Sequence, residues 1–104
     1  MTVSVYVVGP VTGIEGLNRD EFERVRGELA RAGYAARIPH DYVPRSYGWE
    51  AAMRASIAAM LRCDGVALLD GWQASRGARV ERGLARDLGI PCMGWRGWVE
   101  EAAP

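Results

Sequence analysis

Short apolar runs alternate along the chain with longer segments in which apolar residues recur at helical spacing. The strand-like runs are residues 3–8, 34–38, 66–70 and 90–95. The helical segments between them are residues 18–32, 49–62 and 75–88. Strands joined by helices pair in parallel through right-handed crossovers. The pattern therefore predicts an α/β fold, a three-layer flavodoxin or Rossmann-like sandwich whose parallel sheet has four or five strands in the order 2-1-3-4.

The ends of these segments carry helix signals. Asn18 followed by Glu21 has the spacing of a capping box, and Gly33 and Gly89 stand where glycine commonly ends a helix. The apolar positions expected to face the sheet are Phe22, Val25, Leu29 and Ala30 in the first helix and Met53, Ile57, Met60 and Leu61 in the second. The third helix is expected to begin at Ser75.

Length and charge narrow the class of protein. A chain of 104 residues is expected to form one domain, residues 1–104. All 13 basic residues are arginine and are balanced by 13 acidic residues, which disfavours a broad surface for nucleic acid polymers and excludes Schiff-base catalysis by lysine. Two cysteines and one histidine without metal-ligand spacing argue against a disulfide framework or a zinc site. No basic leader or bilayer-length apolar run occurs, so a cytoplasmic protein without membrane contact is expected.

Two loops meet at one edge of the expected sheet. In the order 2-1-3-4 the switch point lies between the first and third strands, so the loops after Val8 and Asp70 form one cleft. Ser75 can cap the third helix, whose first free N–H groups favour an anion such as phosphate. Glu81 follows at roughly 9 Å along the helix axis. This spacing suits a sugar held between a phosphate and a carboxylate, although the glycine-containing loop after Val8 also fits a plain surface turn.

Several segments together resemble a known family, the small nucleoside 2-deoxyribosyltransferase-like proteins. They are residues 6–13, Trp49 with Met53 and Arg54, Cys63 with Asp64, and residues 69–81. The resemblance extends from residue 3 to about residue 93, and its most specific part is Ser-Arg-Gly-Ala-Arg-Val-Glu at residues 75–81. It implies that Glu81 is the nucleophile that cleaves an N-glycosidic bond, and that Tyr6 and Gly9 line the sugar side of the site.

The same resemblance bears on the substrate and on the proton donor. Ser75 stands where transferases of free nucleosides often have a carboxylate and monophosphate hydrolases have a serine, so a nucleoside monophosphate is implied, with Arg76 or Arg79 adding charge. Ser56 replaces the aspartate that is thought to assist the leaving base in relatives. Asp41, Asp64, Asp70 or water could supply the proton instead, and Asp70 is favoured over Asp64 because it is expected to end a strand. The remaining alternative is that turnover is slow or absent.

The function expected from the sequence is hydrolysis of the N-glycosidic bond of a (deoxy)nucleoside 5′-monophosphate through a glycosyl-enzyme intermediate, without metal or cofactor. The alternatives are a nucleoside 2-deoxyribosyltransferase and a non-catalytic nucleotide-binding module. Glu81 is expected to be ionised, because it lies in the first turns of a helix near arginines. The expected catalytic residues are Glu81, Tyr6 and Asp70, and the expected substrate-binding residues are Gly9, Pro10, Thr12, Gly13, Ser56, Trp72, Ser75, Arg76 and Gly77.

Two further segments bear on partners. Residues 39–49 are aromatic enough to form a lid or stacking wall over a nucleobase, or equally to pack onto the second helix, and His40 there fits a hydrogen-bonded bystander. Trp95 and Trp98 suggest more buried area than a small monomer needs. A homodimer or higher homo-oligomer that takes a small-molecule nucleotide or nucleoside is therefore expected. The resemblance also implies that a neighbouring chain completes the site.

Overall fold

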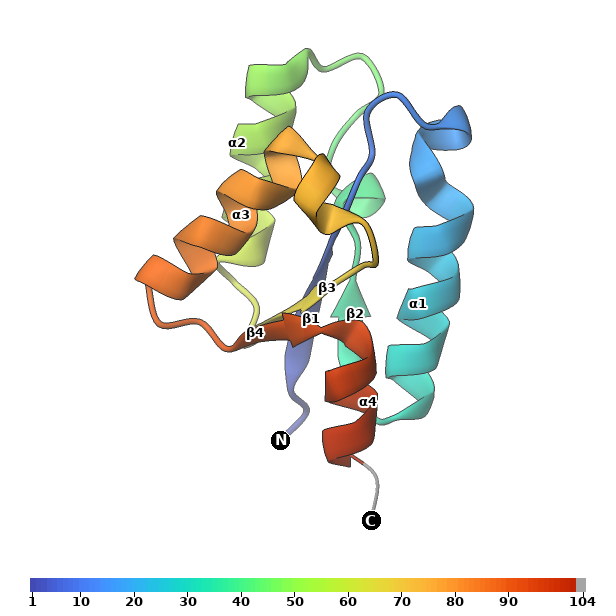
Figure 1. Ribbon diagram of the computed structural model, residues 1–104, viewed down its shortest axis with the longest axis vertical. Coiled ribbons are helices and arrows are strands. Elements are labelled where there is room, and N and C mark those ends of the chain that lie inside the picture. Colours follow the sequence, from blue (N-terminus) through green and yellow to red (C-terminus); the bar gives the residue numbers. More distant parts are fainter. Residues whose placement is uncertain (103–104) are drawn as a thin grey trace.

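A four-stranded parallel sheet crosses the middle of the molecule in the computed structural model, which describes residues 1–102 (Figure 1). Its strands are β1 (Ser4–Val8), β2 (Ala35–Arg37), β3 (Gly65–Leu68) and β4 (Cys92–Gly94). They pair in parallel in the order β2-β1-β3-β4, which confirms the predicted topology. Residues 103 and 104 of the expected domain lie outside the described residues.

Helices cover both faces of the sheet (Figure 1). One face carries α1 (Arg19–Arg31) and α4 (Trp95–Ala102), and the other carries α2 (Trp49–Met60) and α3 (Arg76–Asp87). Short 3₁₀ turns precede the first three helices: η1 (Glu15–Asn18), η2 (Pro39–Asp41) and η3 (Trp72–Ala74). Within residues 1–102, none of the helices is both long and apolar enough to cross a bilayer.

The alternation of side chains along β1 divides the core into two layers. Val5 and Val7 pack with buried residues of α1 and α4, whereas Tyr6 and Val8 pack with buried residues of α2 and α3. Because successive residues of a strand point to opposite faces, one five-residue strand serves both layers. The central strand β1 is therefore buried along its whole length.

The C-terminal segment differs from the prediction. The fourth strand ends at Gly94, and Trp95 begins a helix that the sequence pattern did not indicate. Trp98 is only 6% exposed, and its Nε1 donates a hydrogen bond of 2.8 Å to the carbonyl oxygen of Val66. Trp95 is buried in the same layer. Both tryptophans are thus covered by their own chain, so they provide no argument for a homo-oligomer.

Three local predictions about the helices are also wrong. Asn18 does not cap α1: its backbone is left-handed, with φ +59°, and its Nδ2 donates to the carbonyl oxygen of Pro10 at 2.9 Å. Glu21 pairs with Arg24 instead of completing a capping box. Ala30 and Leu61 are exposed, because each lies one position beyond the buried stripe of its helix. The expected helix ends are confirmed by positive φ at Gly33 and Gly89.

Gly65 provides a test of the contact between β3 and α4. A Cβ atom on Gly65 would lie 2.4 Å from Cη2 of Trp98, so Gly65→Ala forces the indole out of place and should lower the free energy of unfolding by roughly 1–3 kcal/mol. Gly83→Ala is the control, because its Cβ meets open space within a helix and should raise stability by up to about 1 kcal/mol. Urea unfolding measures both, and equal stability of the two variants would contradict the packing described.

Candidate functional site

A cleft of about 620 Å³ opens beside the carboxyl end of β1, between the segments that follow β1, β2 and β3 in the chain. Its walls come from the loop after β1, from residues 39–49, from the first half of α2 and from the start of α3. The predicted site residues that line it are Gly9, Pro10, Thr12, Gly13, Ser56, Ser75, Arg76, Gly77 and Glu81. The loop after β1 therefore lines the cleft as expected, whereas the loop after Asp70 contributes only Ala74, directly before Ser75.

Glu81 lies on the floor of the cleft and is only 6% exposed. Ser56 on α2 donates a hydrogen bond of 2.5 Å from its Oγ to Glu81 Oε2. The Tyr6 hydroxyl lies 2.8 Å from the same Oγ and, because Ser56 gives its proton to Glu81, Tyr6 donates to Ser56. Tyr6 itself is completely buried beneath Ser56 and does not line the cleft. This chain of hydrogen bonds holds one carboxyl oxygen, while Oε1 accepts none from the described residues.

The electrostatic environment of Glu81 differs from the expectation. Burial raises its pKa from 4.5 to about 7, because the ionised carboxylate loses its hydration, and the hydrogen bond from Ser56 offsets only part of this effect. No arginine within the described residues forms an ion pair with Glu81. The prediction that the helix dipole and nearby arginines keep Glu81 ionised is therefore wrong: near pH 7 a large fraction of Glu81 is protonated.

The N-terminal end of α3 forms another part of the cleft wall. Ser75 caps the helix as predicted, its Oγ accepting a hydrogen bond of 3.2 Å from the N–H of Ala78. The N–H groups of Arg76 and Gly77 have no acceptor among residues 1–102. The Arg76 guanidinium lies 3.9 Å from the ring centre of Trp49, whereas Arg79 turns away to bond the carbonyl oxygen of Gln73. Arg76, not Arg79, therefore brings positive charge to the cleft.

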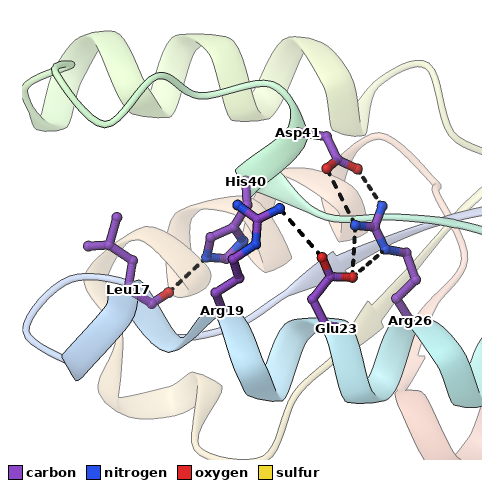
Figure 2. A network of polar contacts seen from close by, with 6 residues as sticks. All are labelled: Leu17, Arg19, Glu23, Arg26, His40 and Asp41. Carbon is purple, nitrogen blue, oxygen red and sulfur yellow. Dashed lines mark hydrogen bonds and ion pairs between the residues drawn. The ribbon is translucent and has the colours of Figure 1, made fainter.

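Residues 39–49 form a wall of the cleft whose beginning is anchored to α1 (Figure 2). His40 Nε2 lies 2.8 Å from the carbonyl oxygen of Leu17, and Arg26 pairs with Asp41 (Figure 2). The His40 ring also packs edge-on against Phe22. The wall includes Arg45, which the sequence-based prediction missed and which makes no ion pair within residues 1–102. In the sequence, the feature that could have pointed to Arg45 as a cleft residue is its place within the aromatic segment 39–49.

The remaining predicted residues lie outside the cleft. Asp70 bonds Arg96 at 2.8 Å and 2.9 Å, because β3 ends at Leu68 and the exposed loop carries Asp70 toward α4. Asp64 accepts hydrogen bonds from the backbone and side chain of Ser4, which lower its pKa. Trp72 packs against the α2–α3 layer. With Asp41 paired to Arg26, none of the three candidate aspartates faces the cleft.

A domain described as a domain of unknown function, DUF4406, matches residues 3–94. The chain belongs to the DUF4406 family. No curated protein matches it in sequence. The matched part of this DUF4406 domain includes every residue that lines the cleft and stops before α4.

Among residues 1–102, no group of three or more histidine, cysteine, aspartate or glutamate side chains is placed to hold a metal ion. The carboxyl and guanidinium groups that line the cleft are those of Glu81, Arg45 and Arg76.

The raised pKa of Glu81 predicts how stability depends on pH. Below pH 4.5 both the folded and the unfolded chain keep the proton, so burial carries no ionisation cost. Between pH 4.5 and about 7 only the unfolded chain ionises readily, so stability falls as the pH rises, by about 3 kcal/mol in all. Glu81→Gln removes this loss and should be more stable than the unmodified chain at pH 8 but not at pH 4. Urea unfolding at both pH values measures the difference.

Glu100→Gln is the matched control, because Glu100 is exposed on α4 and its replacement should leave the pH profile unchanged. A profile of Glu81→Gln that parallels that of the unmodified chain would show that Glu81 titrates in the folded protein as it does in the unfolded chain.

Proposed function

We propose that the cleft binds a nucleoside 5′-monophosphate and that Glu81 cleaves its N-glycosidic bond. The observation that carries this proposal is a buried carboxyl with one oxygen held by Ser56 and the other free, on the floor of a cleft that also contains the free N-terminus of α3. The cleft volume of about 620 Å³ falls within the usual range for small-molecule sites.

The start of α3 would hold the phosphate. Its unpartnered N–H groups, the positive end of the helix dipole and the Arg76 guanidinium all favour a dianion there. Glu81 is six residues further along the same helix, about 9 Å of axial rise. The distance matches a ribose or deoxyribose held by its 5′-phosphate with C1′ toward the carboxyl.

The reaction would proceed through a covalent intermediate. Ionised Glu81 attacks C1′ with Oε1 while the base leaves, and water then hydrolyses the glycosyl ester. Ser56 contributes by fixing Oε2, and Tyr6 contributes by fixing the Ser56 hydroxyl. Both act as positioning residues, because a carboxyl held in one orientation loses less freedom on reaching the attacking geometry.

A second candidate is a nucleotide-binding module without turnover. It is favoured by the absence of a carboxylic acid other than Glu81 from the described lining of the cleft, because relatives of the resembled family are thought to use one to assist the leaving base. Monophosphate binding without release of base at high protein concentration would support this alternative over the enzyme.

Glu81→Gln tests the nucleophile. The amide cannot form the glycosyl ester, so release of base from a panel of ribonucleoside and deoxyribonucleoside monophosphates should fall by at least about a thousandfold. Chromatography of the free base measures this. The fold of the variant is checked by its unfolding curve, since it is expected to be at least as stable as the unmodified chain. Release that continues at an unchanged rate would remove Glu81 from the mechanism.

Ser75→Asp tests the phosphate position without removing the helix cap, because aspartate and serine are comparable caps. The added charge should raise the KM for a nucleoside monophosphate by roughly tenfold or more through repulsion of the phosphate. The KM for the matching free nucleoside should change little. Ser75→Asn is the control, since asparagine caps the helix without charge. An equal effect of both substitutions on the monophosphate would place the phosphate elsewhere.

A further inference from the structure

The described lining of the cleft has one carboxyl group for two chemical tasks. An ordinary nucleobase leaves readily only when an acid gives it a proton as the N-glycosidic bond breaks. Glu81 must be ionised to attack C1′, so it cannot supply that proton in the same step. Ser56 directs its proton to Glu81, and the three candidate aspartates lie outside the cleft. The proposed attack therefore lacks a carboxylic acid on the side of the leaving group.

The other proton-bearing side chains of the cleft do not fill this gap. His40 lies with Nε2 against the carbonyl oxygen of Leu17, so this nitrogen carries the proton and donates it to that backbone oxygen (Figure 2). In this tautomer Nδ1 carries no proton, and it is buried without a hydrogen-bond partner among residues 1–102. The remaining groups are hydroxyls, a phenol and guanidinium ions, which release protons far less readily than a carboxylic acid.

The charges of the cleft give a second, independent indication. Glu81 is a buried acid without a cationic partner among the described residues, whereas Arg45 and Arg76 line the exposed rim without ion pairs to a carboxylate. A positive charge on a ligand beside Glu81 would favour the ionised carboxylate that the attack requires. The cleft is thus complementary to a ligand that is anionic at one end and cationic at the other.

Building on the proposed function, we infer that the substrate is a nucleoside 5′-monophosphate whose base carries a positive charge on the ring that includes its glycosidic nitrogen. As the bond between Glu81 Oε1 and C1′ forms, the bond between C1′ and the ring nitrogen breaks. Its electron pair passes to the ring and cancels the positive charge, so the base leaves neutral without taking a proton. Water then opens the ester, which leaves a hydroxyl on C1′, restores the carboxylate and releases one proton to solvent.

Two matched pairs of compounds test this inference on the unmodified chain. Nicotinamide mononucleotide has a cationic pyridinium nitrogen, and its reduced form has nearly the same shape with a neutral nitrogen. In the same way, 7-methylguanosine 5′-monophosphate is the cationic counterpart of guanosine 5′-monophosphate. For each compound the rate enhancement is kcat/KM divided by the rate constant of the uncatalysed reaction. In at least one pair this enhancement should be larger for the cationic member by roughly 100-fold or more, which is the usual contribution of the general acid that the neutral member would need. Glu81→Gln should abolish the release.

The outcomes separate this inference from the proposed function. Release of base from neutral nucleotides at a kcat/KM equal to that of the cationic ones, with loss in Glu81→Gln, would overturn the charge requirement and leave the N-glycosidase proposal standing. No release from either member of both pairs, or from the wider panel of monophosphates, would overturn both proposals. Release that is unchanged in Glu81→Gln would do the same.

Discussion

The burial of one carboxyl group constrains the rest of this structure. A buried carboxyl is costly unless hydrogen bonds replace its hydration, and within the described part of the chain a single donor, Ser56, supplies the bond. Ser56 is held in turn by Tyr6, so α3, α2 and β1 each contribute one member of the chain. The relative placement of these three elements is therefore fixed by polar contacts at the same point where the cleft forms.

Close approach of two glycine backbones to neighbouring side chains brings the cleft walls together. A Cβ atom on Gly77 would lie 2.9 Å from Sδ of Met53, and one on Gly9 would lie 2.6 Å from Cδ1 of Leu69. Glycine at these positions lets the start of α3 reach α2 and lets the loop after β1 settle over the end of β3. The glycines are thus explained by packing within the protein, before any contact with a ligand is considered.

The predictions that succeeded depended on local patterns. Four apolar runs and their spacing were enough for the parallel sheet and its order, and Ser75 carried its capping signal in its own sequence. Those that failed depended on partners distant along the chain. Asp70 was expected to end a strand, but it lies in the loop after β3 and faces Arg96 of a helix that was not predicted. Asn18 does not cap its helix, because its side chain bonds the carbonyl oxygen of Pro10. The pKa of Glu81 was misjudged because burial by tertiary packing outweighs the helix dipole.

The ionisation of Glu81 couples ligand charge to the proposed chemistry. In the free protein the proton stays on the carboxyl up to about pH 7, which avoids an unpaired charge in the interior. A cationic group placed beside it lowers this pKa, so binding would itself release the proton and create the nucleophile. By linkage, such a ligand binds more tightly when the carboxyl is already ionised, whereas a neutral ligand gains nothing from the ionisation. In the proposed mechanism, the same burial that keeps Glu81 protonated in the free protein would therefore favour a ligand that carries a positive charge.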